Sequence, residues 1–548
     1  RYTTRAMIRI ETDMADQAMR LAGRHGFEVD RRVIQLVFER HIRLSGEQRS
    51  AIERVASREC IAAVVGRAGA GKTTMMTAAR EVWEAAGYRV VGAALAGKAT
   101  EGLEKEAGIE SRTLSSWQLR WSKDRDLLDD RTVFVLDEAG MVSSRQMAEF
   151  VAAVSAAGAK LVLVGDPEQL QPIEAGAAFR ALVDRIGYAE LENIYRQKQQ
   201  WMRDASLDLA RGNIREAIAT YAEQGRVLGS ALKEDAIANL IADWSRDYEP
   251  AKSTLILAHL RRDVRHLNDL ARGKLMERGL IELGHAFRTE DGERRFAAGD
   301  QIVFLRNEGS LGVKNGMIAR VVEASQGRIV AEIGDGPSET RRRVEIEQRF
   351  YRNIDHGYAT TIHKSQGATV DQVKVLATLS LDKHLTYVAM TRHRQDVALY
   401  YGSRSFDKIG GLAKVLGQPN AKETTLDYSE SRLYSAALHY TTRRGMHAVR
   451  VARTLVSDRH RWVLRQKARL EKLTGRLISL GAHLGIVKAP PSAPEVRSEP
   501  MIPGVGSFAK TVADVVEERL LADPACKRQW EEISDRFRSI YALSLIHI

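Results

Sequence analysis

The sequence predicts an α/β fold in which parallel sheets carry a phosphate-binding loop, and three observations support this. Short apolar runs typical of strands alternate with helical segments from residue 44 to about residue 185, as in strands joined by crossover helices. The run at residues 61–65 leads directly into the glycine-rich sequence GRAGAGKT. The run at residues 133–136 ends in two acids, Asp137 and Glu138, at the strand end where α/β sheets bind ligands.

The glycine-rich sequence, residues 66–73, matches the phosphate-binding pattern G-x-x-x-x-G-K-T. Its glycines allow backbone N–H groups to close around phosphate oxygens, and the following helix directs the positive end of its dipole at the same anion. Lys72 supplies a point charge for the β- and γ-phosphates, and Thr73 offers a hydroxyl to Mg²⁺. A chance glycine-rich turn is the alternative, which the preceding strand disfavours. The predicted nucleotide-binding residues are Gly66, Gly69, Gly71, Lys72, Thr73 and Thr74.

The acidic pair predicts a second part of the same site. Asp137 is expected to hold Mg²⁺ together with Thr73, and Glu138 is expected to polarise the attacking water as a general base. An ordinary acidic strand end is the alternative, since such pairs are common on their own. The phosphate-binding loop about 65 residues earlier favours the catalytic interpretation. A nucleotide and Mg²⁺ are therefore the expected ligands.

Polar residues that could complete the site follow later along the chain. The run at residues 161–164 leads into GDPEQLQP, in which Gln169 can sense the γ-phosphate, although Gly-Asp-Pro is itself a turn signal. Arg196 lies within YRQ, and Arg392 lies within YVAMTRHR. Because arginines from a second domain can couple nucleotide hydrolysis to domain closure, we expect both to face the γ-phosphate. His363 is compatible with a phosphate contact and equally with a structural role.

Bulk composition narrows the class of protein. The chain has 548 residues with 44% hydrophobic content, enough for several packed domains, and a net charge of +12. A sequence pI of about 9.5 favours a polyanionic partner, most simply nucleic acid. The two cysteines, Cys60 and Cys526, exclude a disulfide framework and a cysteine-rich zinc site, and they fit a reducing cytosol. No apolar stretch reaches membrane-spanning length, and no signal peptide is visible.

Changes of pattern divide the chain into segments. Short alternating runs at 301–305, 319–322, 328–333 and 342–346 predict a small antiparallel barrel inserted into a second α/β domain. The chain begins at Arg1 without Met, so we expect it to be part of a longer protein. The expected segments are a helical lead-in from a missing upstream domain (1–43), a first α/β domain with the nucleotide site (44–185), the start of the second (186–284), the barrel (285–350), the rest of the second (351–415), a basic helical region (416–488), and a linker and tail (489–548).

The basic helical region offers three interpretations. Between Arg443 and Arg476 there are eleven Lys and Arg residues, opposed only by Asp458 and Glu471. The segment could be the solvated face of a docked helix, a contact to DNA phosphates, or a site for a protein partner. After it, residues 489–494 read APPSAP, which predicts a stiff linker.

Taken together, these motifs resemble those of superfamily 1 helicases of the RecD-like group. The resemblance covers about residues 44–400, and the order and spacing of the motifs agree throughout. It implies two RecA-like P-loop domains that hold ATP in the cleft between them, with single-stranded DNA across both. The sequences GDQIVF and GVKNG, within residues 299–316, resemble the entry to an SH3-like β-barrel inserted in the second domain.

The resemblance also implies roles for individual residues. LSGEQR at residues 44–49 resembles the Q motif, in which Gln48 would contact adenine. GKAT at residues 97–100 and TLSSW at residues 113–117 resemble DNA-contacting motifs, the second with Ser where relatives often carry His. TTIHKSQG at residues 360–367 resembles a motif that contacts both ligands. The implied DNA-binding residues are Lys98, Thr100, Thr113, Thr361 and His363, and the implied additions to the ATP site are Gln48, Gln366 and Gly367.

A narrower resemblance is to the helicase half of TraA-type conjugative relaxases of Ti-like plasmids. It is based on YTTR at residues 2–5, the residues GRAGAGK of the phosphate-binding loop, and the basic helical region. In that family an upstream domain nicks DNA through a tyrosine and a histidine cluster, and the histidines here lack the tight spacing of metal ligands.

These resemblances imply an ATP- and Mg²⁺-dependent DNA helicase, moving 5′ to 3′ on one strand of duplex DNA during plasmid conjugation, without the nicking chemistry. Expected partners are single-stranded and duplex DNA and conjugation or secretion-system proteins, with no membrane span, in the bacterial cytoplasm. A stand-alone RecD-like repair helicase is one alternative. A DNA-stimulated ATPase that remodels a complex without unwinding is the other.

Overall fold

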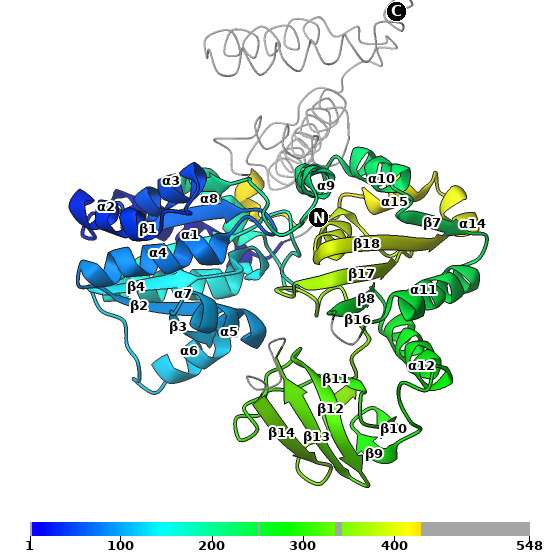
Figure 1. The fold of residues 1–548 in the computed structure, drawn as a ribbon. Helices are drawn as coiled ribbons and strands as arrows, with labels where there is room; N and C mark the ends of the chain where they lie inside the picture. The colour runs from blue at the N-terminus through cyan, green and yellow to red at the C-terminus, as the bar shows by residue number, and fades with distance from the viewer. Residues whose placement is uncertain (1–2, 250–251, 335–341, 429–548) are drawn as a thin grey trace, which may run out of the picture. The chain divides into compact units, whose positions relative to one another are not determined.

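The computed structural model describes residues 3–249, 252–334 and 342–428, which contain two α/β units and an antiparallel β insert (Figure 1). The basic helical region from residue 429 onwards, and the predicted linker and tail, lie outside the described residues. In the part of the chain that the structure describes, no helix combines the length and apolar character needed to cross a membrane.

The first α/β unit is a sheet of parallel strands in the order β3-β2-β4-β5-β1-β6. The strand runs predicted at 61–65, 133–136 and 161–164 are confirmed, and all three strands are buried because helices cover both faces. β5 lies between β1 and β4, so the glycine-rich loop and the acidic pair start from the same edge of the sheet. The strands are β1 (Ile61–Gly66), β2 (Arg89–Ala94), β3 (Glu110–Thr113), β4 (Thr132–Leu136), β5 (Lys160–Gly165) and β6 (Ala189–Leu191).

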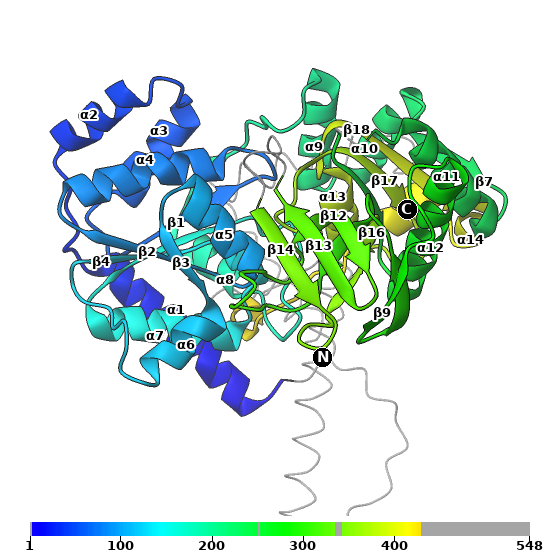
Figure 2. The same cartoon turned by 60° about the horizontal axis from the view of Figure 1, so that its bottom comes forward.

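Helices pack on both faces of this sheet (Figure 2). α3 packs against α4 together with α2, whereas α1 packs against α7 and α8. Side chains define the helix starts: Ser45 and Gln48 form a capping box on α3, and Ser143 caps α7. The helices are α1 (Arg5–Gly23), α2 (Arg31–Arg40), α3 (Gly46–Val55), α4 (Lys72–Ala85), α5 (Gly97–Glu106), α6 (Leu114–Trp121), the short η1 (Ala139–Met141), α7 (Ser144–Ala157) and α8 (Ala178–Ile186).

Residues 1–43, expected as a helical lead-in, form α1 and α2 within the described range. Met14, Ala18 and Leu21 of α1 are fully buried and share one hydrophobic core with the strands of the first sheet. Phe38 of α2 belongs to the same core. The two helices are therefore part of the packing of the first unit.

The second α/β unit has a parallel sheet in the order β16-β8-β17-β18-β7. Along β8 (Thr254–Ala258), Leu255 and Leu257 enter one hydrophobic core and Ile256 and Ala258 the other, the alternation expected of a strand covered on both faces. The other strands are β7 (Val227–Ser230), β16 (Ala359–Thr361), β17 (Val370–Leu376) and β18 (His393–Gly402). The helices are α9 (Gln200–Arg211), α10 (Ile214–Glu223), α11 (Lys233–Asp247), α12 (Arg261–Glu277), α13 (Lys383–Met390), α14 (Ser403–Asp407) and α15 (Leu412–Leu416).

The insert between α12 and β16 is antiparallel, as predicted. Its sheet has the order β14-β13-β12-β11-β15, and a separate hairpin of β9 and β10 precedes it. The sheet takes β15 as an edge strand because Ile354 and His356 pair with β11, so the insert extends past residue 350. The strands are β9 (His285–Thr289), β10 (Gly292–Phe296), β11 (Gln301–Phe304), β12 (Ile318–Ser325), β13 (Arg328–Ile333), β14 (Arg342–Glu347) and β15 (Ile354–His356).

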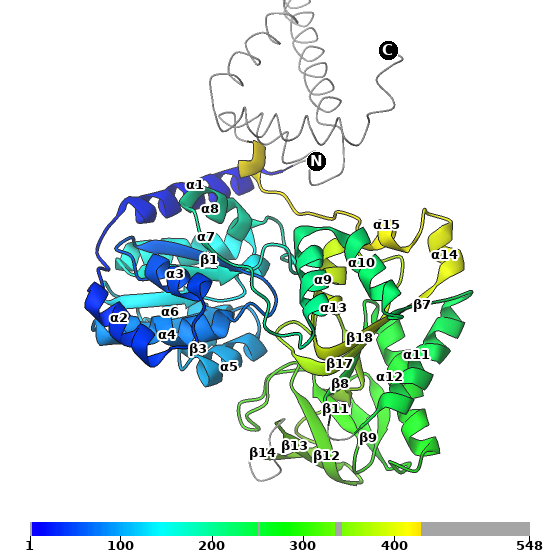
Figure 3. The same cartoon turned by 45° about the horizontal axis from the view of Figure 1, so that its top comes forward.

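After α15 the chain leaves the second unit and ends, within the described residues, on the first. We call residues 417–428 the return segment; its last four residues form η3 (Thr425–Tyr428) beside α1, where Figure 3 shows it in yellow. Asp427 forms two hydrogen bonds with Arg180 of α8, at 2.9 and 2.5 Å. The buried carboxylate of Glu11 in α1 accepts hydrogen bonds from the backbone N–H and hydroxyl of Thr425, both at 2.6 Å. The return segment is thus fastened to the first unit.

We expect Glu11→Ala to lower the free energy of unfolding of the first unit by about 2 kcal/mol or more, because the buried Ser144 hydroxyl and the half-buried donors of Thr425 lose a charged acceptor. A shift of several degrees in the first thermal transition would report this. Glu104→Ala, at an exposed position on α5, is the matched control. Equal shifts in the two variants would contradict a stabilising role for the Glu11 contacts.

Candidate nucleotide-binding and hydrolysis site

The loop between β1 and α4 adopts a backbone that needs glycine at two positions. Gly69 and Gly71 have φ angles of 83° and 74°, in the left-handed region. A Cβ on Gly69 would lie 2.6 Å from the Cβ of Arg196, and one on Gly71 would lie 2.5 Å from Nε2 of Gln48. α4 begins at Lys72, and its N-cap residue, Gly71, has no side chain to cap it. The first N–H groups of the helix are therefore available to an anion.

Lys72 folds back over the loop that precedes it. Its Nζ donates to the carbonyl oxygens of Gly66 at 2.6 Å and Arg67 at 3.1 Å. Burial lowers the pKa of Lys72, and the nearby carboxylates of Asp166 and Asp137 oppose that shift. The ammonium group is therefore surrounded by oxygen atoms that a phosphate could replace.

Asp137 and Glu138 follow β4 directly. The Glu138 N–H donates to Oδ1 of Asp137 at 2.8 Å, and Glu138 has a left-handed φ of 52°, which is uncommon for a residue with a side chain and is concentrated at functional sites. Burial raises the pKa of both carboxyl groups. The charge of Asp137 adds to the effect of burial and brings the pKa of Glu138 to about 7, while Arg392 and Lys72 oppose the rise.

Gln366 brings the second unit to this acid. Its Nε2 donates to Oε2 of Glu138, and its Oε1 is buried without a hydrogen-bond partner among the described residues. Gly367 follows with a φ of 70°. A Cβ at Gly367 would lie 3.9 Å from the Glu138 carboxylate, so both residues of the predicted pair lie beside the acid.

Arg196 and Arg392 are both held by the end of α13. Nη1 of Arg196 donates to the carbonyl oxygen of Thr391 at 2.8 Å, and Nε of Arg392 donates to that of Val388 at 3.0 Å. Burial lowers the pKa of Arg196 to about 9, with the charge of Arg392 as the next cause. Burial also lowers the pKa of Arg392, which is only 2% exposed, and the charge of Glu138 opposes this. A buried and a half-buried cation thus lie close to the acid.

One pocket joins several predicted residues. It is lined by Lys72, Glu138, Gln169 and Gln366, so the loop, the acid, the predicted sensor and the second unit share one space. Nε2 of Gln169 donates to Oδ2 of Asp166 at 3.2 Å. Asp166 itself appears in the sequence only as part of a turn signal, and its role as an acceptor could not be read from that pattern.

The other end of the loop is lined by Gln48 and Tyr195. Nε2 of Gln48 donates to the carbonyl oxygen of Gly71 at 3.1 Å, and the Tyr195 N–H donates to that of Gly69 at 2.9 Å. Tyr195 is 51% exposed, and a carbon of its ring lies 3.6 Å from where a Cβ of Gly71 would be. Tyr195 was not predicted as a site residue, although it directly precedes Arg196.

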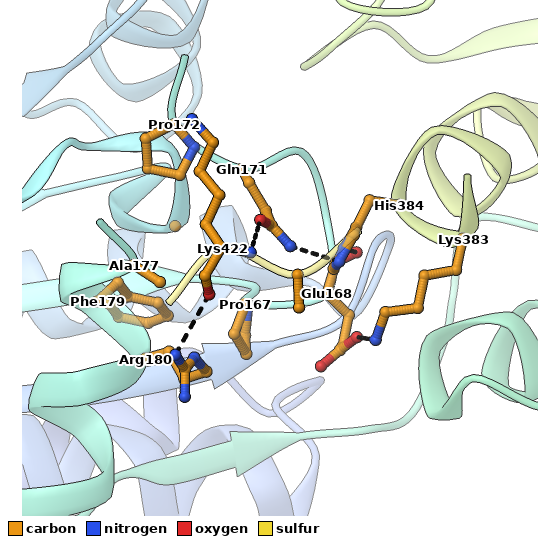
Figure 4. A pocket seen from close by; sticks show the side chains of 12 residues that line it. Pro167, Glu168, Gln171, Pro172, Ala177, Phe179, Arg180, Lys383, His384 and Lys422 are labelled. Carbon is orange, nitrogen blue, oxygen red and sulfur yellow. Dashed lines mark hydrogen bonds and ion pairs between the residues drawn. The ribbon is translucent and has the colours of Figure 1, made fainter. Parts of the chain in front are cut away.

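A second pocket is lined by Glu168 and Gln171 of the first unit, Lys383 and His384 of α13, and Lys422 (Figure 4). Lys383 of α13 donates to the Glu168 carboxylate at 2.8 Å, and Nδ1 of His384 lies 2.7 Å from the Glu168 carbonyl oxygen. The backbone N–H of Lys422, in the return segment, donates to Oε1 of Gln171 at 2.5 Å. This pocket therefore marks a seam where the second unit and the return segment bind the first unit.

The five predicted DNA-binding residues occupy different surroundings. Lys98 shares a small pocket with Lys364 of the second unit and Gly316 of the insert. The hydroxyls of two threonines serve local structure: Thr100 donates to the carbonyl of Gly97 at 2.7 Å, and Thr113 caps α6.

Thr361, also predicted to bind DNA, accepts a hydrogen bond from the Lys364 N–H at 3.3 Å. The His363 ring lies 5.6 Å from that of His259, so the structure pairs histidines that are far apart in the sequence. The DNA contacts of all five residues stay a prediction.

Comparisons with known proteins match this chain to a family model and to the two relatives described here. The AAA domain family matches residues 43–231. A probable conjugal transfer protein TraA of Sinorhizobium fredii is 63% identical over 99% of this chain and 49% of its own length. An ATP-dependent RecD2 DNA helicase of Deinococcus radiodurans is 27% identical over 64% of this chain and 48% of its own length. The chain spans about half the length of these curated relatives.

Among solved structures, a Pif1 helicase from Bacteroides in complex with ADP-AlF3 and single-stranded DNA is similar to this chain. The two are 19% identical, and the match covers 65% of this chain and 92% of that chain with a TM-score of 0.43.

Proposed function

We propose that this chain, which is a close homologue of the TraA conjugal transfer proteins and carries a RecD-like helicase domain, uses ATP hydrolysis to unwind duplex DNA. The observation that supports it best is the meeting of Glu138, from the first α/β unit, with Gln366 and Arg392, from the second. Because both units contribute to one acid, hydrolysis there would be linked to the contact between them.

The proposed reaction begins with ATP placed along the loop. The phosphates would lie at the N-terminus of α4 and exchange places with the carbonyl oxygens that Lys72 now contacts. Adenine would lie at the other end of the loop, against the Gln48 amide and the exposed face of Tyr195. The Lys72 and Gln48 side chains and the Tyr195 backbone already contact the loop, so little movement is needed for binding.

In hydrolysis, Glu138 would take a proton from the attacking water as its oxygen bonds to the γ-phosphorus and the bond to the leaving ADP oxygen breaks. A pKa near 7 suits a base that must be ionised at neutral pH and still accept a proton. Arg196 and Arg392 would stabilise the charge on the transferred group, and Gln169 would report its presence through Asp166.

The residues proposed to hold Mg²⁺ fit such an ion. Thr73 lies in the first turn of α4, and the half-buried Asp137 carboxylate follows β4 at the same sheet edge. Hydroxyl and carboxylate oxygens are the ligands that Mg²⁺ prefers. When bound, the ion would neutralise charge on the phosphates. Thr74, the next residue of α4, remains a proposed nucleotide contact.

DNA is the proposed polymer substrate. The net charge of +12 and the Lys98–Lys364 pocket, shared by the first unit, the insert and the second unit, support binding of a phosphate backbone. Lys98, Thr100, Thr113, Thr361 and His363 are its proposed contacts. We further propose 5′ to 3′ movement during conjugal plasmid transfer in the bacterial cytoplasm, with conjugation or secretion-system proteins as additional partners.

A strand-separation assay tests this proposal. We expect the purified 548-residue chain to separate a duplex that has a 5′ single-stranded tail when ATP and Mg²⁺ are present. A duplex that has only a 3′ tail should stay annealed. Glu138→Gln is the matched control, since it changes one atom of the proposed base. DNA-stimulated ATP hydrolysis without strand separation on any tailed substrate would favour a remodelling ATPase instead.

A transfer experiment separates conjugation from repair. A plasmid whose own copy of this protein carries Glu138→Gln should lose conjugal transfer while the host keeps its resistance to DNA damage. Normal transfer combined with damage sensitivity would instead favour a stand-alone repair helicase.

A further inference from the structure

Asp166 collects hydrogen-bond donors from three parts of the molecule. Its side chain is almost fully buried, and Oδ2 accepts from the Tyr387 hydroxyl at 2.8 Å and from Gln169 at 3.2 Å. Oδ1 accepts from the Glu168 N–H at 3.1 Å and lies 3.5 Å from a guanidinium nitrogen of Arg67. One carboxylate therefore joins the phosphate-binding loop, the proposed sensor and α13.

Tyr387 provides the contact from the second unit. It lies on α13, is fully buried, and belongs to the hydrophobic core of the second sheet. Its hydroxyl donates to Asp166 and accepts the backbone N–H of Ala68 at 2.8 Å. Ala68 is the third residue of the phosphate-binding loop, so this single hydroxyl spans the loop and the Asp166 carboxylate.

An arginine of the site follows directly after the same helix, which ends at Met390. Arg392 follows Tyr387 by five residues, and its Nε bonds back to the Val388 carbonyl in the last turn of α13. Because a helix is stiff over one or two turns, holding Tyr387 in place also sets where Arg392 can point. A group that anchors α13 to the loop would therefore set the distance between Arg392 and Glu138.

We propose that Tyr387 is a positioning residue for hydrolysis, whose hydroxyl joins the phosphate-binding loop and the Asp166–Gln169 pair to α13 and so places Arg392. This rests on the proposed function, and it identifies a contact through which the two α/β units are coupled at the ATP site. The hydroxyl acts through Asp166 and Ala68 and touches neither the acid nor the proposed arginines.

Proton transfer is not part of this role. Burial and the charge of Asp166 raise the pKa of Tyr387 well above its ordinary range, so its hydroxyl stays protonated at neutral pH. It contributes a donor and an acceptor, and both are lost in Tyr387→Phe, while the ring that fills the core remains.

In Tyr387→Phe we expect kcat for DNA-stimulated ATP hydrolysis to fall about 10-fold, the scale of losing hydrogen bonds to a buried charged group. KM for ATP and the dissociation constant of ADP should change less than about threefold, because Lys72 and the loop backbone remain. Tyr400→Phe is the matched control, since Tyr400 is also buried and donates to a carboxylate, Asp243, at 2.8 Å within the second unit. That variant should keep wild-type kcat.

A double variant tests the path through Asp166. If Tyr387 acts through that carboxylate, Tyr387→Phe with Asp166→Asn should be less damaged than the product of the two single effects. Unchanged kcat in Tyr387→Phe, or equal losses of kcat and ADP affinity, would overturn the positioning role while leaving the proposed function intact. A wild-type chain that hydrolyses no ATP would overturn both.

Discussion

Glu138→Gln should hydrolyse ATP at least about 10²-fold more slowly than the wild-type chain while binding ATP with similar affinity. The amide keeps the shape of the side chain and its place beside Gln366, but it cannot take a proton from water. Lys72→Ala provides the contrast, because it removes the charge that offsets the phosphates and should lose ATP binding. Single-turnover hydrolysis and binding of a fluorescent ATP analogue measure the two effects separately. A wild-type rate of hydrolysis in either variant would show that ATP is not hydrolysed at this site.

The pH dependence gives the same prediction a second readout. The pKa of Glu138 is raised to about 7, first by burial and then by the charge of Asp137. Since only the ionised carboxylate can act as a base, kcat/KM for ATP should rise about tenfold per pH unit below pH 7 and level off above it. A flat profile in the wild-type chain would argue against Glu138 as the base.

Replacing Arg196 or Arg392 by Ala should reduce hydrolysis by about 10³-fold, within the range of arginines that stabilise phosphoryl transfer. ATP affinity should fall much less, because the loop and Lys72 supply most ground-state contacts. Arg392 is buried and Arg196 is half-buried near Glu138, so their loss removes positive charge where little water can replace it.

Arg226→Ala is a fitting control for these two variants. Arg226 forms an ion pair with Asp396 at 2.8 Å, and its side chain is 44% exposed at the edge of the second unit, so hydrolysis should stay at the wild-type rate. If ATP affinity fell in full proportion to hydrolysis in Arg196→Ala or Arg392→Ala, these residues would be binding groups. The proposed link between hydrolysis and closure of the two units would then be wrong.

The sequence was most informative where one short stretch of chain determines its own structure. The apolar runs that became β1, β4 and β5 were predicted to within a residue or two, because a strand covered on both faces must be apolar along its length. The phosphate-binding loop was equally predictable, because Gly69 and Gly71 adopt backbone angles that other residues rarely take. The antiparallel character of the insert also followed from its alternating runs.

Contacts between segments far apart in the sequence could not be predicted in this way. Tyr387 and Asp166 are 221 residues apart, and neither the spacing nor the composition around either one indicates the other. The same holds for Glu11 and Thr425, which are 414 residues apart and join the first described helix to the return segment. The pairing of β15 with β11, beyond the expected end of the insert, is a further case.

The sequence by itself determined the phosphate-binding loop, the acidic pair, the α/β class and the resemblance to RecD-like helicases. Local periodicity and backbone preference carry that information, and both act over a few residues. Only the tertiary structure decided that Glu138 faces Gln366, that Tyr387 spans Ala68 and Asp166, and that α1 packs into the first core. Those contacts arise when whole sheets and helices bury their apolar faces together, which brings side chains from remote positions within hydrogen-bond distance.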